Sequence, residues 1–214
     1  MVNLSKFLGK IHYWLFNKIK WFESIEKDII DYCRGNNLPV DIWNSKVWDK
    51  YGKPTEDRPL EELIDTSDIH GWLQDKIEKA ESRQAEYITE ILKSSNSYEK
   101  DLIDIFYNRG KEDGKFSRTQ RSAASPEEVF SAINDYILDG MPCDRVNEFL
   151  ENTEDVFTWR ATRCLHAIYW NNAGGEVGKF YLLRGKWIEA FVETFTKEFK
   201  YTKNDDGSES IRGK

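Results

Sequence analysis

The chain has few of the residues that cross-link a fold or bind metal ions. Its 214 residues include three cysteines, three histidines and five prolines. Cys33, Cys143 and Cys164 are odd in number and form no Cys-x-x-Cys pair. This argues against a disulfide framework and against a cysteine zinc site.

Long apolar stretches are also missing. No run approaches the ~20 apolar residues that are needed to span a bilayer. The stretch from Ile11 to Phe16 is followed by Lys18 and Lys20, and no small-residue cleavage site comes after it. We therefore expect no signal peptide, no stable membrane insertion and a cytoplasmic location.

Positive charge is not in excess. The net charge is −7 at neutral pH and the isoelectric point is near 5.2. Nucleic-acid binding needs a concentrated basic face, so we expect no nucleic-acid partner. Hydrophobic residues make up 39% of the chain and aromatic residues 14%, which is too much for a disordered protein.

The hydrophobic pattern has a helical period along most of the chain. The clearest helix start is the stretch from Ser125 to Glu128, which has a capping residue, a proline at the first helical position and acids in the first turn. No stretch alternates for long enough to predict a strand. We therefore predict an all-α fold, a bundle of long antiparallel helices with shorter additional helices. The predicted helices cover residues 4–33, 40–51, 60–64, 67–93, 98–108, 125–139, 144–150, 154–172 and 177–199.

Two segments lack this pattern. Residues 109–125 contain two glycines and several basic and hydroxyl residues. They are predicted to form a mobile loop or a sub-domain boundary within a single helical domain of residues 1–214. Residues 204–214 are polar and are predicted to be a frayed tail.

All three histidines lie among apolar and aromatic residues, on three different predicted helices. They are His12, His70 and His166, and Glu81 shares the core-facing stripe of the helix that carries His70. Such nitrogen and oxygen donors suit iron, zinc or manganese. The leading hypothesis is a buried histidine and carboxylate metal site for redox, oxygen-related or hydrolytic chemistry.

The alternative is that the histidines are structural. Histidines of intermediate burial are common, and the chain has neither the Glu-x-x-His nor the His-x-x-x-His spacing of known helical metal bundles. In this interpretation the protein is a non-enzymatic module that binds a small ligand or a protein, a second copy of itself included.

Two further residues are candidates for binding a cofactor or a small polar ligand. Arg184 lies on the apolar stripe of the last predicted helix, where Glu81 is its predicted ion-pair partner. Trp170 shares a predicted helix face with His166. Both residues also fit a purely structural role.

Cys143 is the candidate for thiol chemistry. It follows a Gly-Met-Pro turn at a predicted helix start, where the helix dipole stabilises a thiolate. His70 or His166 would then act as the base. The neighbouring Asp144 opposes thiolate formation, and a small apolar filler is the structural alternative.

Overall fold

The computed structural model describes residues 8–214, and helices predominate in a mixed α and β fold. Eight α-helices and one four-stranded antiparallel sheet lie within this range. The helices are α1 (Lys10–Gly35), α2 (Val40–Tyr51), α3 (Leu60–Leu63), α4 (Ile69–Ser94), α5 (Glu99–Gln120), α6 (Pro126–Asn134), α7 (Ala167–Ala173) and α8 (Val177–Phe195). The strands are β1 (Asn147–Asn152), β2 (Val156–Ala161), β3 (Phe199–Lys203) and β4 (Glu209–Gly213).

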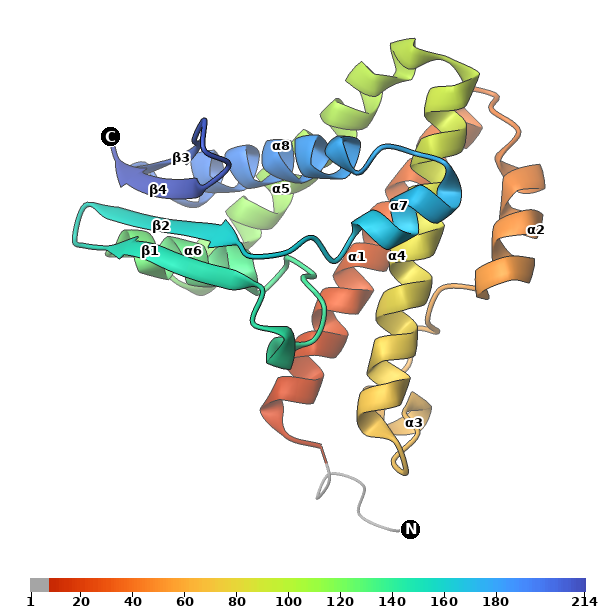
Figure 1. Ribbon diagram of the computed structural model, residues 1–214, viewed down its shortest axis with the longest axis horizontal. Helices are drawn as coiled ribbons and strands as arrows, with labels where there is room; N and C mark the ends of the chain where they lie inside the picture. Colours follow the sequence, from red (N-terminus) through yellow and green to blue (C-terminus); the bar gives the residue numbers. More distant parts are fainter. Residues whose placement is uncertain (1–7) are drawn as a thin grey trace.

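The sheet shows that the all-α prediction is wrong. Its strand order is β1-β2-β4-β3, and α6 packs against β2 and β4 (Figure 1). In β2 the successive residues Phe157, Thr158 and Trp159 are all buried. A strand covered on both faces does not alternate, so the test for alternation misses it. Its β-branched and aromatic composition was the signal that favoured a strand.

The C-terminal segment forms a hairpin and is not a frayed tail. β3 and β4 pair from Phe199 opposite Gly213 to Lys203 opposite Glu209. The turn between them includes Asp206 and Gly207, and Gly207 has a φ of +81°. An Asp-Gly turn between β-forming residues is a strong hairpin signal, and the polar character of the segment obscured it.

The predicted loop over residues 109–125 is helical as far as Gln120, because its two glycines serve packing. A Cβ atom on Gly110 would lie 2.3 Å from the carbonyl oxygen of Trp187, and one on Gly114 would lie 2.4 Å from that of Phe191. Glycine at these two positions therefore lets α5 approach the backbone of α8 closely.

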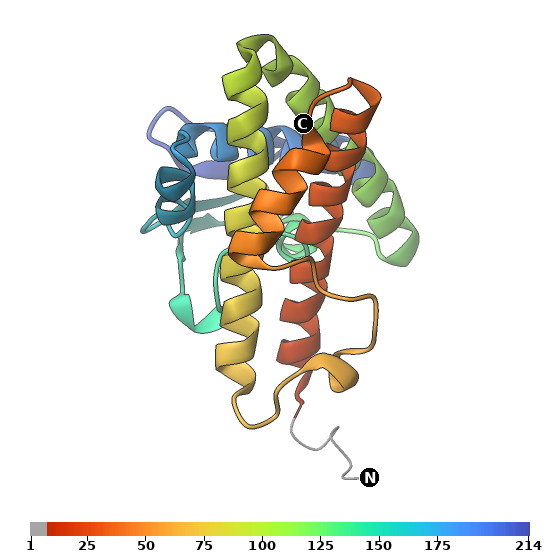
Figure 2. The same ribbon diagram turned by 90° about the vertical axis from the view of Figure 1, so that its right-hand side faces the viewer.

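α1 and α4 lie side by side along most of their lengths, with α2 beside them (Figure 2). Ile19, Ile25 and Ile29 of α1 are buried in the core that these helices share. Asp68 caps α4 by accepting a hydrogen bond from Gly71 N–H at 2.9 Å. The predicted cap of α6 is confirmed, since Ser125 Oγ accepts from Glu128 N–H at 3.3 Å.

The first four residues of the predicted N-terminal helix, 4–7, lie outside the described range. No helix within residues 8–214 is both long and apolar enough to cross a membrane. The sheet with α5 and α8 lies to one side of the α1–α4 pair, and α7 joins the two parts (Figure 1). The candidate site lies at this junction.

Candidate functional site

The four residues predicted to bind metal form two separate pairs. The ring centroids of His12 and His70 lie 5.9 Å apart, near the N-terminal ends of α1 and α4. His166 contacts Glu81 instead, with Nδ1 2.9 Å from Oε1. His70 and Glu81 lie about 16 Å apart along α4, at 1.5 Å of rise per residue. The four side chains therefore do not surround one point.

His12 and His70 lie at helix starts, without a set of metal ligands around them among the described residues. Nδ1 of His12 accepts a hydrogen bond from Gly9 N–H at 3.0 Å, so this nitrogen caps α1. His70 is exposed at the start of α4. Within residues 8–214, no group of three or more His, Cys, Asp or Glu side chains is arranged to hold a metal ion.

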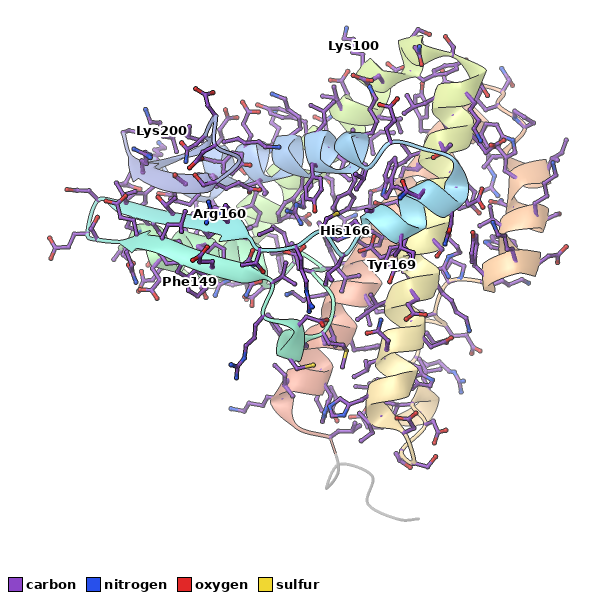
Figure 3. All side chains as sticks on the ribbon, in the orientation of Figure 1. Lys100, Phe149, Arg160, His166, Tyr169 and Lys200 are labelled. Carbon is purple, nitrogen blue, oxygen red and sulfur yellow. The ribbon has the colours of Figure 1, made fainter. Side chains whose placement is uncertain are left out.

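His166 lies between two carboxylates, just before α7 (Figure 3). Its Nδ1 faces Glu81, and its Nε2 lies 3.1 Å from Asp139 Oδ1. Arg184 donates to the same oxygen of Asp139 at 2.7 Å, so the predicted Glu81–Arg184 pair is wrong. The reason is that residues 162–165 connect β2 to α7 and are not helical. This connection brings His166 between Glu81 and the segment that follows α6.

These residues form a chain of alternating charges, which we call the His166 cluster. It comprises Glu81, His166, Asp139, Arg184 and Glu209. The last contact joins Arg184 Nη2 to Glu209 Oε1 at 3.8 Å. The cluster links α4, α8, β4 and the segments that precede α7 and follow α6. Glu81 and His166 are each 2% exposed.

The protonation states of the cluster follow from its contacts. Burial alone would lower the pKa of His166, but Glu81 and Asp139 outweigh that effect and raise the pKa to about 9. Burial would raise the pKa of Asp139, yet Arg184 and His166 hold it well below its usual range. At neutral pH the His166 imidazolium therefore faces the ionised carboxylate of Asp139. Both of its ring nitrogens have partners, Glu81 at Nδ1 and Asp139 at Nε2. This is the arrangement of a structural brace.

Lys18 lies near the cluster and has no such partner. The residue is 4% exposed. Its ammonium donates to Asn134 Oδ1 at 3.4 Å and lies 3.7 Å from the ring centroid of Trp14. No ion pair joins it to any carboxylate of residues 8–214. Burial lowers the pKa of Lys18 to about 8, although Asp139 and Asp135 partly offset this effect.

A cleft of about 370 Å³ opens beside Lys18 and Asp139. Trp14 lines one side, and Met141 and Phe149 contribute apolar wall. Volumes of this size are typical of small-molecule sites, as are apolar walls with a few polar groups. Phe149, which is 61% exposed, lies on β1 at the edge of the sheet (Figure 3).

The loop that forms the far wall is held in an unusual conformation. Gly140 has a φ of +69°, and a Cβ there would lie 2.5 Å from Leu165 Cδ1. Asp144 ties the loop together, accepting from Met141 N–H at 2.8 Å and from Arg163 Nη2 at 2.9 Å. Arg145 follows with a φ of +47° and lines the cleft. Such a conformation is costly for a residue other than glycine, and it is often kept where a side chain has a function.

The other predicted site residues do not line this cleft. Cys143 is exposed in the short 3₁₀ turn Pro142–Asp144, so it does not begin an α-helix. Trp170 is 1% exposed and lines a second cavity of about 200 Å³ beside Thr89 and Gly175. Arg184 belongs to the His166 cluster, where Asp139 and Glu209 match its charge.

Lys18 is the residue that the sequence analysis missed as a site, since it entered only as a charge that ends an apolar run. A signal was present. Lys18 follows Leu15 by three positions and Trp14 by four, so it lies on the apolar face of its helix. A charge on a core-facing stripe needs a partner, and none was assigned.

Comparison of the chain with protein-family models, with curated proteins and with solved structures gives no match. A functional assignment for this fold therefore rests on the residues of the cleft and on their chemistry.

Proposed function

We propose that the cleft at Lys18 binds a small anionic ligand and that the Lys18 ammonium is its main polar contact. The observation that carries this proposal is a buried ammonium without a carboxylate partner, facing a cleft of about 370 Å³. A buried charge without a counter-charge is costly. A bound anion would supply the missing charge.

The charges around the cleft favour an anion. Lys18 and Arg145 are cations, and Asp139 is the only carboxylate among the lining residues. His166 and Arg184 already neutralise Asp139. The residues that line the cleft therefore carry two cations against one carboxylate, in a protein whose net charge is −7, and this balance favours an anionic ligand.

The walls favour a ligand with a compact apolar part. Trp14 presents its ring, with Nε1–H fixed to Asp135 Oδ1 at 2.8 Å. Met141 and Phe149 complete the apolar lining. Orientation by one or two polar groups in an apolar cleft is the common plan of small-molecule sites. This supports the small-ligand interpretation more than a site for iron, zinc or manganese.

Three probes of one shape test the preference for charge: benzoate, benzamide and benzylammonium. Binding is followed by the backbone and indole N–H resonances of the ¹⁵N-labelled protein, with the Trp14 indole signal assigned through Trp14→Phe. We expect benzoate to shift the Trp14 signal and to bind about tenfold more tightly than benzamide, since a charge-assisted hydrogen bond is lost in the amide. Benzylammonium is expected not to bind.

The matched variants are Lys18→Met and Lys10→Met, because Lys10 is an exposed lysine on the same helix. Lys18→Met should remove the preference for benzoate, and Lys10→Met should keep it. The proposal is wrong if the three probes bind equally, or if benzoate binds Lys18→Met as it binds the unaltered protein. Circular dichroism of each variant establishes that the fold is intact.

A further inference from the structure

We infer that Lys18 forms an imine with a small 2-oxo acid bound in the cleft, because its buried amine faces the cleft and no carboxylate holds it in an ion pair. This inference rests on the proposed anion site and adds a chemical step to it. It differs from anion binding in one respect that can be measured, namely a covalent bond at one lysine.

Burial without a counter-charge favours the neutral form of an amine, which is the nucleophilic form. With its pKa lowered to about 8, about a quarter of the Lys18 side chains are neutral at pH 7.5, against about one in a thousand for an ordinary lysine. Lys18 is also the only lysine among residues 8–214 that is buried. The surroundings therefore single it out from the exposed lysines.

The ligand class follows from the lining of the cleft. An imine requires a carbonyl carbon, and the positive lining favours a carboxylate next to it. Arg145, with its fork of donors, suits that carboxylate. The apolar walls at Trp14, Met141 and Phe149 suit a short hydrocarbon part. A small 2-oxo acid has all three features.

The step balances without an oxidant or a reductant. The lone pair of the neutral Lys18 nitrogen attacks the carbonyl carbon, the C–N bond forms as the π bond of the carbonyl breaks, and a proton moves from nitrogen to the former carbonyl oxygen. The C–O bond of this carbinolamine then breaks, water leaves, and a C=N bond remains.

Asp139 is not the proton donor of this step. Its carboxylate stays ionised, because Arg184 and His166 hold its pKa well below the usual range. It therefore cannot donate the proton that the leaving water needs, and that proton comes from solvent in the open cleft.

Reductive trapping tests the inference. The full-length protein is incubated with pyruvate and sodium cyanoborohydride, and the modified residue is found by intact mass and peptide mapping. L-lactate, which has a hydroxyl in place of the carbonyl, is the matched probe. We expect one pyruvate-derived group on Lys18, formed at least about tenfold faster than on any exposed lysine, given the larger neutral fraction. Lactate should add nothing.

Lys18→Arg keeps the positive charge but forms no stable imine, so it should escape labelling. Lys10→Met should label like the unaltered protein. Asp139 and Asp135 are the charged groups that act on Lys18 electrostatically, and Arg145 lines the same cleft. The labelling rate should follow the neutral fraction of Lys18, with half of its maximum near pH 8 and a plateau about one pH unit higher. Label spread over exposed lysines, or equal total labelling of Lys18→Arg, would overturn the inference.

The two proposals fail in different ways. If benzoate binds through Lys18 but pyruvate leaves it unlabelled, the anion site stands and the imine is wrong. If Lys18 is labelled selectively but the three benzene probes bind equally, the imine stands and the anion preference is wrong.

Discussion

The His166 cluster and Lys18 are two buried sets of charge that lie around the same carboxylate, Asp139. In the cluster every charge faces an opposite one, from Glu81 through His166 and Asp139 to Arg184. Lys18 faces an amide oxygen and an indole ring. A matched buried network holds elements together, whereas an unmatched charge adds a cost to the folded state. The difference separates a brace from a site.

The two regions also respond to pH in opposite directions. His166 has its pKa raised from 6.5 to about 9, so its stabilisation is complete below pH 6.5 and is lost as the pH rises through 9. Lys18 has its pKa lowered from 10.5 to about 8. Its cost to stability is therefore full below pH 8 and disappears as the pH rises toward 10.5. A pH series can thus assign an effect to one region or the other.

The largest expected effect comes from breaking the brace. Arg184→Met leaves Glu209 without its cation and Asp139 with His166 alone, and removing one partner of a buried pair costs about 3–5 kcal/mol. The free energy of unfolding, measured by urea with circular dichroism detection, should fall by that amount. The matched control is Arg163→Met, because Arg163 pairs with Asp144 but is 55% exposed. An exposed pair is worth at most about 1 kcal/mol.

If Arg184→Met costs no more than Arg163→Met, the cluster does not brace the fold. The contrast between a structural His166 cluster and Lys18 would then be wrong, and Arg184 would become a candidate for ligand binding.

The next effect is the pH dependence of the brace. His166→Gln removes the titrating ring, so the stability difference between the unaltered protein and this variant should shrink between pH 6.5 and pH 9. The raised pKa of His166 corresponds to about 3 kcal/mol over this range, at 1.36 kcal/mol per pKa unit. Urea unfolding across the range measures it. His70→Gln, at an exposed histidine, is the control and should leave the pH dependence of the free energy of unfolding unchanged. If His166→Gln also leaves it unchanged, the assignment of charge in the cluster is wrong.

The sequence predicts the helical part of this fold much better than the sheet. Local signals specify α6, where the cap at Ser125 and the proline after it act within one turn. The β1–β2 hairpin depends on burial of β2 from both sides, which removes the alternation of apolar and polar residues that identifies a half-buried strand. Gly110 and Gly114 interrupt the helical pattern in the sequence, yet they are needed for the approach of α5 to α8. Only the tertiary contact distinguishes that role from a loop.

The same limit applies to the site. Helical periodicity places Glu81 on a core-facing stripe, and Glu81 is indeed buried. Its partner could not be predicted, since His166 is positioned by an irregular connection and not by a helix. The burial of Lys18 could have been predicted from helical periodicity, because Lys18 lies on the apolar face of α1. The cleft could not be predicted, since its far wall comes from residues 139–149, which are distant in sequence.

The smallest expected effect is a gain in stability when the site is removed. The lowered pKa of Lys18 corresponds to a cost of up to about 3 kcal/mol at neutral pH. Lys18→Met removes this cost but also loses the contact with the Trp14 ring, worth about 0.5–2 kcal/mol. We therefore expect a net gain of about 1 kcal/mol in the free energy of unfolding by urea at pH 7, falling toward zero near pH 10.5.

Lys10→Met, the exposed control, should change the free energy of unfolding at neither pH. A more stable protein that no longer binds benzoate is what a site held at the expense of the fold predicts. A clear loss of stability at pH 7 would mean that the ammonium is structural, and Lys18 would then belong with the brace.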